Sequence, residues 1–127
     1  MLLKLNRVVT SVRRQDEGAA MLAVISICAG LSEEALFRGA IQGSLADRAG
    51  WMVALILASL AFGAAHLITW TYAIIAALIG AYLGLLWIWT GNLLTPVVTH
   101  AVYDFAALVY FLRVYRSGRP REDHSGT

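Results

Sequence analysis

The long central stretch of this sequence is almost free of charge, and this constrains the fold more than any other feature. Between Gly18 and Leu112 the charged side chains are Glu33, Glu34, Arg38, Asp47, Arg48 and Asp104. Over the whole chain 14% of residues are charged and 59% are hydrophobic, whereas about a quarter of the residues in soluble domains are charged. A soluble protein with so much uncharged surface would aggregate. The sequence therefore predicts an integral membrane protein.

Four apolar segments have the length that a helix needs to cross a bilayer, which is about 20 residues. They cover residues 18–45, 51–69, 72–89 and 94–112. Turn residues at 47–50 and 90–92 separate them, and Pro96 suits the first turn of the last segment. Gly80 and Gly84 form a face of small residues for close helix packing. The predicted fold is all-α, an integral membrane helical bundle of about four transmembrane helices.

The two ends of the chain hold most of the basic residues. We expect residues 1–17 to be a basic cytoplasmic lead-in, 18–112 to be the membrane-embedded core, and 113–127 to be a basic, disordered cytoplasmic tail. An even number of spans puts both ends on one side, and Lys and Arg mark the cytoplasmic side. The net charge of +2 comes mainly from these ends, which favours contact with anionic lipid head groups and not with nucleic acid.

Charged side chains inside the predicted spans are energetically costly and therefore require an explanation. Each carboxylate or guanidinium at the bilayer centre costs about 2.5–3.5 kcal/mol on insertion scales. Four such residues, if unpaired, would together cost roughly 10 kcal/mol, which is comparable to the total stability of a domain, about 5–15 kcal/mol. The four are Glu33, Glu34, Arg38 and Asp104. They are expected either to pair with one another or to line a wet, functional cavity.

Helical spacing separates the roles of the two adjacent glutamates. Glu34 and Arg38 are four residues apart, so they lie on one face of a helix and can form an ion pair. Glu33 is offset from Glu34 by about 100° and is left free for chemistry as a general base. The alternative is that all three side chains form one structural salt-bridge cluster.

Two further pairs have the same spacing of four residues. Phe62 and His66 share a face of the second segment. His100 and Asp104 share a face of the fourth segment, where the carboxylate can accept a hydrogen bond from the imidazole. In straight helices the two histidines would differ in depth by more than about 10 Å. A shared site therefore requires strong tilt, a broken helix, or a segment that does not cross the membrane fully.

In their order along the chain these residues resemble the motifs of a known family. Residues 33–38 (EEALFR) resemble the motif EExxxR, residues 62–66 (FGAAH) resemble FxxxH, and residues 100–104 (HAVYD) resemble HxxxN/D. Together they are similar to the CPBP family, which comprises the CAAX prenyl proteases and bacterial relatives linked to bacteriocin maturation and self-immunity. The similarity covers about residues 20–108, which correspond to the catalytic core of the family.

The resemblance implies a glutamate-dependent intramembrane endopeptidase. By motif position Glu33 is the general base and shares a water with His66, and this water attacks the scissile carbonyl. His100 and the residue at 104 would stabilise the oxyanion. This chain has Asp104 where the prenyl-protease branch has Asn, so we expect the carboxylate to serve His100 instead of the substrate. The residues expected to support the site are Glu34, Arg38 and Phe62.

The resemblance also implies what the protein works with. The expected substrate is a membrane-associated peptide or protein, either prenylated and of the CAAX type or a leader peptide. The expected location is the inner, or cytoplasmic, membrane of a bacterium. Relatives carry further spans before the core. Here these helices are either dispensable, lost through truncation, or supplied by a homo- or hetero-oligomer. No cofactor is expected.

Two other interpretations stay open. Four side chains are acceptable zinc ligands, namely Glu33, Glu34, His66 and His100. The same hydrolysis could therefore use a bound zinc ion, although the sequence has no HExxH pair that would put two histidine ligands on one helix turn. Alternatively, the chain is a non-catalytic immunity or adaptor protein, and its polar cluster binds a peptide or a partner helix.

Overall fold

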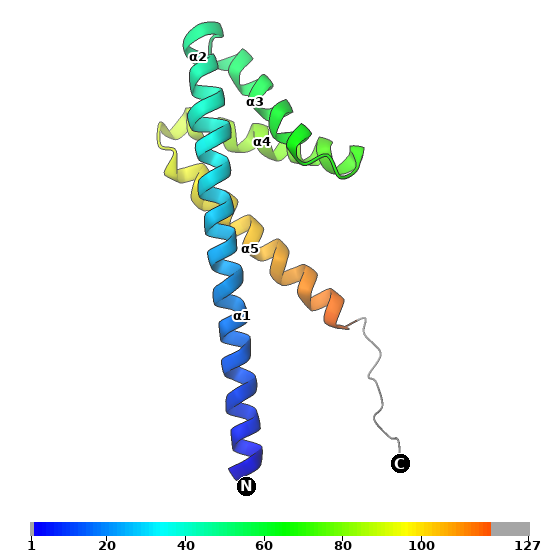
Figure 1. Ribbon diagram of the computed structural model, residues 1–127. Coiled ribbons are helices and arrows are strands. Elements are labelled where there is room, and N and C mark those ends of the chain that lie inside the picture. Colours follow the sequence, from blue (N-terminus) through cyan, green and yellow to red (C-terminus); the bar gives the residue numbers. More distant parts are fainter. Residues whose placement is uncertain (1, 118–127) are drawn as a thin grey trace.

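The fold begins with one long helical rod (Figure 1), and the computed structural model describes residues 2–117. Helix α1 (Leu2–Glu34) continues into a π-helical segment, η1 (Ala35–Gln42), and then into α2 (Gly43–Ala49). The turn predicted at 47–50 is shorter than expected, because Ala49 is still helical and only Gly50 breaks the helix. The φ angle of Gly50 is 83°, which residues other than glycine rarely adopt.

Three further helices complete the fold, α3 (Trp51–Ala65), α4 (Trp70–Thr90) and α5 (Leu94–Ser117). The described residues thus form the predicted all-α bundle and contain no strand. Helix α4 begins where the Thr69 hydroxyl accepts a hydrogen bond from the amide of Tyr72 at 3.1 Å, as an N-cap does. It ends at Gly91, which has a left-handed conformation. Of the tail predicted over 113–127, the first residues belong to α5, and residues 118–127 lie outside the described part of the chain.

Three stretches are long and apolar enough to cross a membrane. They are Asp16–Ala49 with 34 residues, Trp70–Thr90 with 21 and Leu94–Tyr115 with 22. Helix α3 has 15 residues, fewer than the number of about 20 that a span needs. The second predicted segment, 51–69, therefore stops short, at Ala65. The amide of His66 bonds back to the carbonyl oxygen of Gly63 at 3.1 Å, which tightens the last turn and ends the helix.

Close approaches between backbones hold the helices together. Helices α3 and α4 form an antiparallel hairpin beside η1 and α2, and α5 runs back beside α1 (Figure 1). A Cβ atom at Gly63 would lie 2.6 Å from the carbonyl oxygen of Ala73, and one at Gly30 would lie 2.9 Å from that of Val97. Small residues at such crossings are typical of membrane helices.

The small-residue face predicted on α4 is confirmed. A Cβ atom at Gly80 would lie 3.2 Å from the ring of Phe62, and one at Gly84 would lie 2.5 Å from the side chain of Leu55. Both neighbours belong to α3. The two glycines therefore bring the hairpin helices into close contact.

Polar and apolar side chains are distributed in the reverse of the soluble pattern. Glu34, Arg38 and Gln42 are fully buried, and His100 is almost so. Large apolar side chains face outward from the helices, for example Val24, Met52, Leu78 and Val102. Such a surface suits lipid and not water. The chain is therefore an integral membrane protein, with its polar groups turned inward.

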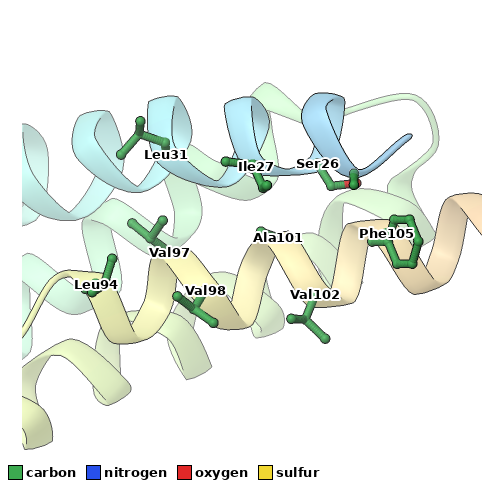
Figure 2. A pocket seen from close by; sticks show the side chains of 10 residues that line it. Ser26, Ile27, Leu31, Leu94, Val97, Val98, Ala101, Val102 and Phe105 are labelled. Atoms are coloured by element: carbon green, nitrogen blue, oxygen red, sulfur yellow. The ribbon is translucent and has the colours of Figure 1, made fainter. Parts of the chain in front are cut away.

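Helices α1 and α5 enclose an apolar groove of about 590 Å³ (Figure 2). Its lining includes Ile27, Val98 and Phe105. The Ser26 hydroxyl is buried in its wall and has no hydrogen-bond partner among the described residues. No residue of the polar cluster described below lines this groove. The groove is therefore a feature of the helix seam and is separate from the candidate site.

Candidate active site

Glu34 and Arg38 form the buried ion pair that their spacing predicts. The Oε2 and Nε atoms are 3.1 Å apart, and both side chains are almost completely buried. The guanidinium also donates from Nη2 to the carbonyl oxygen of Gly80 on α4 at 2.6 Å. Its Cζ atom lies 4.8 Å from the centre of the Phe62 ring on α3. Three helices thus contact one guanidinium, and these contacts reduce the cost of burying it, although Nη1 has no hydrogen-bond partner among the described residues.

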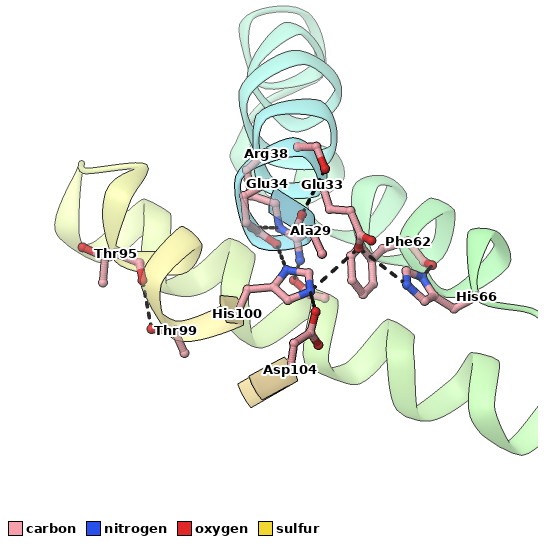
Figure 3. A network of polar contacts seen from close by, with 12 residues as sticks. Ala29, Glu33, Glu34, Arg38, Phe62, His66, Thr95, Thr99, His100 and Asp104 are labelled. Atoms are coloured by element: carbon pink, nitrogen blue, oxygen red, sulfur yellow. Dashed lines mark hydrogen bonds and ion pairs between the residues drawn. The ribbon is translucent and has the colours of Figure 1, made fainter. Parts of the chain in front are cut away.

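The neighbouring Glu33 side chain points toward two histidines (Figure 3). Its Oε2 atom lies 3.5 Å from Nε2 of His66 and 3.8 Å from Nε2 of His100. The Glu33 side chain is 31% exposed, whereas that of Glu34 is fully buried. Within the described part of the chain this Oε2 atom has no hydrogen-bond donor at bonding geometry. Glu33 therefore keeps an acceptor available beside both rings.

His66 lies at the end of α3 and is oriented by its own helix. Its Nδ1 atom is 2.8 Å from the carbonyl oxygen of Phe62. A carbonyl oxygen can only accept, so we assign the proton to Nδ1. In the neutral ring Nε2 then presents a lone pair toward Glu33. The ring also stacks on Phe62, with centroids 4.5 Å apart, as the spacing of these two residues predicts.

His100 on α5 lies between carboxylates of two helices. Its Nδ1 atom is 2.8 Å from Oε1 of Glu34. Its Nε2 atom is 3.4 Å from Oδ2 of Asp104, which is the contact that their spacing predicts. The bond to Glu34 joins residues 66 positions apart, so no local pattern indicates it. Through Glu34 the buried Arg38 is connected to the imidazole of His100.

The two histidines share one site because α3 is short and inclined to the rod (Figure 1). His66 follows the last residue of α3, and His100 lies near the beginning of α5. Of the three possibilities that the sequence raised, strong tilt is seen for α3 and α4 relative to the rod (Figure 1), and α3 is also shorter than a span needs. All seven predicted site residues lie in one connected network of contacts.

A small cavity of about 40 Å³ opens beside the histidines. Its walls include His66, His100 and Asp104, together with aliphatic side chains of α4 such as Ile75 and Ile79. One water molecule needs at least about 10–15 Å³, so the cavity has room for a few water molecules. The site is therefore able to hold water between titratable side chains and an apolar wall.

The candidate zinc ligands do not form a ready-made metal site. Within the described part of the chain, no group of three or more His, Cys, Asp or Glu side chains is arranged to hold a metal ion. Glu34, one of the four candidates, already contacts both Arg38 and His100. The geometry of these residues thus gives the zinc hypothesis no added support.

Comparison with known proteins identifies the family. The family described as type II CAAX prenyl endopeptidase, Rce1-like, matches residues 15–106, which contain every residue of the cluster. The chain belongs to the Rce1-like family. This is a family of proteases, which are hydrolases.

A relative of this Rce1-like chain is the uncharacterized protein YpbD of Bacillus subtilis (strain 168). The two are 35% identical over 94 residues, which are 72% of this chain and 47% of YpbD. The chain thus spans about half the length of the curated relative that it matches. No solved structure gives a significant match.

Three residues near the Rce1-like site were missed by the sequence analysis. Gln42 is fully buried and donates from Nε2 to the carbonyl oxygen of Gly84 at 3.4 Å. Its position, four residues after Arg38, is the signal that would have indicated it. Tyr72 and Tyr103 line the cavity, and nothing in their local sequence marks them.

Proposed function

We propose that this chain is an intramembrane endopeptidase of the CPBP, CAAX-protease type, which hydrolyses a peptide bond of a membrane-associated substrate. The observation that supports this is the pairing of Glu33 with His66, whose Oε2 and Nε2 atoms lie 3.5 Å apart; of the two, His66 lines the cavity with room for water. An ionised carboxylate and a neutral Nε2 both accept, so neither satisfies the other. A water molecule has two protons and would donate one to each.

In this proposal Glu33 is the general base. The water oxygen attacks the scissile carbonyl carbon and forms a C–O bond, while the water proton passes to the Glu33 carboxylate. His66 accepts the second hydrogen bond of the water and so directs the attacking lone pair. When the tetrahedral intermediate collapses, the C–N bond breaks and the proton on Glu33 moves to the leaving amine. The products are an acid and an amine, and the base is regenerated.

His100 is assigned to the oxyanion. Its Nδ1 atom contacts Glu34, so Nε2 is the atom directed toward Glu33 and the cavity. Because Nδ1 donates to Glu34, a proton on Nε2 as well makes the ring an imidazolium, and this N–H would donate to the negative charge that develops on the carbonyl oxygen. Asp104, 3.4 Å from Nε2, is assigned to orient the ring, because an ionised carboxylate would repel an oxyanion.

The proposal includes a substrate and a location. The family description names CAAX prenyl substrates, which supports a prenylated protein, and a leader peptide is the other class. The apolar exterior supports a reaction within the membrane, and we place the protein in the cytoplasmic membrane of a bacterium, with both ends in the cytoplasm. A homo- or hetero-oligomer is the further proposed partner. The proposed reaction uses no cofactor.

Turnover of a fluorogenic peptide library by detergent-purified protein tests this function. The matched variant is Glu33→Gln, which keeps the shape of the side chain and removes the base. We expect turnover to fall by more than about 100-fold, within the range that general base catalysis contributes. The melting temperature is expected to stay the same, because this side chain is partly exposed. Full activity of Glu33→Gln would show that another group is the base.

Two further outcomes decide between the alternatives. Turnover that is lost with a chelator and restored by zinc would favour the metal-dependent form of the same hydrolysis. Absence of cleavage by well-folded wild-type protein would favour the non-catalytic immunity or adaptor protein. Binding of a peptide without cleavage would then be its expected property.

A further inference from the structure

Gln42, the last residue of η1, has the same kind of partner as Arg38. It donates from Nε2 to the carbonyl oxygen of Gly84 at 3.4 Å, and Arg38 donates to that of Gly80 at 2.6 Å. Both side chains are fully buried. Each bond joins residues 42 positions apart, so two positions of η1, four residues apart, are bonded to two successive turns of α4. These two bonds are called the η1–α4 contact below.

The glycines of α4 make the η1–α4 contact possible. A Cβ atom at Gly84 would lie 2.7 Å from Oε1 of Gln42 and 2.5 Å from Cδ1 of Leu55. A larger residue at this position would displace the side chains of Gln42 and Leu55. Hydrogen bonds from a side chain on one helix to another helix are a typical means of association in membranes. The contact is therefore built from both sides, by the buried amide of Gln42 and by α4 backbone that the glycines leave uncovered by side chains.

Stability alone does not account for an amide at position 42. The carbonyl oxygen of Gly84 can only accept, so the amide must turn its Nε2 atom toward it. This leaves Oε1 buried and without a partner among the described residues, and an unsatisfied buried acceptor is destabilising. A leucine of similar size would not have this cost. The amide is thus expected to serve something other than stability.

Gln42 is the last residue of η1, and the π-helical form of η1 is what its bond to α4 would stabilise. A π-helix has i→i+5 hydrogen bonds and is rare, and it occurs mostly as short segments within α-helices, frequently at functional sites. The residues of η1 therefore have the ordinary α-helix as an alternative. A return to α-helical bonding would rotate Arg38 and Gln42 relative to α4 and break both bonds. Arg38 would then move relative to Glu34, which contacts Nδ1 of His100 at 2.8 Å.

We propose that Gln42 is a positioning residue for the hydrolysis proposed above, and that it holds η1 in its π-helical register on α4. The inference rests on the proposed function. Gln42 does not line the cavity, so it acts through others: its bond to α4 fixes Arg38, and Arg38 fixes the carboxylate of Glu34 that orients His100.

Kinetics of matched variants test the positioning role. In Gln42→Leu, kcat is expected to fall at least about tenfold with KM within about twofold, since a misplacement of about 1 Å can cost about 100-fold in rate. Gly84→Ala disrupts the same contact from the α4 side. It is expected to have the same effect, a lower kcat with little change in KM. The control is Gly39→Ala, also in η1, because a Cβ atom there would meet its nearest atom, Cδ2 of Leu93, at 3.6 Å. This control is expected to keep the wild-type kcat.

Amide hydrogen exchange in detergent provides a readout that does not depend on turnover. Exchange over residues 39–47 is expected to be faster in Gln42→Leu and Gly84→Ala, and unchanged in Gly39→Ala. Unchanged kcat together with unchanged exchange in both variants would overturn the proposal. Unchanged kcat with faster exchange would also overturn it, because the contact would then be structural only.

If the proposed hydrolysis is wrong, the kinetic measurements give a different result from failure of the positioning role. Wild-type protein and Glu33→Gln would then be equally inactive, and the positioning role would fall with the function. The exchange rates of wild-type protein and Gln42→Leu would still differ. If Gln42→Leu does not fold, Gly84→Ala decides: a wild-type kcat in that variant would overturn the positioning role.

Discussion

Glu34 is the residue through which Arg38 and His100 are connected. One carboxylate oxygen is 3.1 Å from Nε of Arg38, and the other is 2.8 Å from Nδ1 of His100. Glu33, one position earlier, faces the histidines and is partly exposed. The two adjacent glutamates therefore have different environments, because one step along a helix turns a side chain by about 100°.

Replacing Glu34 is expected to affect folding more than replacing Glu33. In Glu34→Gln the guanidinium of Arg38 stays buried and loses its counter-charge. Breaking a buried pair in this way costs about 3–5 kcal/mol, so we expect a lower melting temperature and less folded protein in detergent. Thermal unfolding followed by tryptophan fluorescence measures this, with Glu33→Gln as the control. Equal stability of the two variants would show that the buried pair does not stabilise the fold.

At the scale of helices, the local sequence was sufficient to predict those elements whose position follows from composition. The four helices follow from apolar runs, and Gly91 and Pro96 lie in the turn and in the first helical turn where they were expected. The end of α3 could not be predicted, because Leu67 and Ile68 continue the apolar run without a stop signal. The helix ends where the amide of His66 bonds back to the carbonyl oxygen of Gly63, and Gly63 packs against the start of α4, a contact that depends on the folded hairpin.

Helical spacing predicted three separate pairs, the family resemblance placed them in one site, and the fold shows the contacts that join them. Residues four apart lie on one face of a helix, so the pairing of Glu34 with Arg38 and of His100 with Asp104 was visible in the sequence. The contacts from Glu34 to His100 and from Glu33 to His66 connect different helices. The π-helical form of η1 was also not predictable, because its bonds to α4 join residues 42 positions apart.

The hairpin of α3 and α4 gives a prediction at this scale. In Gly63→Ala the new Cβ atom would lie 2.6 Å from the carbonyl oxygen of Ala73 and 2.8 Å from Cβ of Ala77, so the helices must separate. Such overpacking costs about 1–3 kcal/mol. It also moves His66, three residues later, away from Glu33. We expect both the melting temperature and peptide turnover to fall.

The matched control for this prediction is Gly18→Ala. A Cβ atom at Gly18 would meet nothing within 4 Å, so the same chemical change adds no collision. We expect unchanged turnover and a melting temperature that is the same or slightly higher, since alanine favours a helix over glycine. If Gly63→Ala were as stable as wild-type protein, α3 and α4 would be packed less tightly at Gly63 than these distances indicate.

At the scale of the whole molecule, the rod and α5 define which side of the membrane each end occupies. The N-terminal end of α1 and the C-terminal end of α5 both lie on the side of the molecule away from α2 (Figure 1). Arginines lie near both ends, at Arg13, Arg14, Arg113 and Arg116. Lys and Arg are retained on the cytoplasmic side of membranes. We therefore predict that both ends face the cytoplasm and that α2 lies on the opposite side.

Single-cysteine labelling tests this orientation. In a Cys28→Ser background, Arg14→Cys and Ser117→Cys are expected to react with a membrane-impermeant maleimide in inside-out vesicles, and Arg48→Cys in right-side-out vesicles. Positions 14 and 48 lie 34 residues apart, about 50 Å along a helix. That exceeds the bilayer thickness of about 40–45 Å with its head groups. A rod whose axis is close to the membrane normal would therefore place both positions in water. Labelling of all three from one side would mean that the rod does not cross the membrane. A reversed pattern would keep the span and contradict the direction that the arginines indicate.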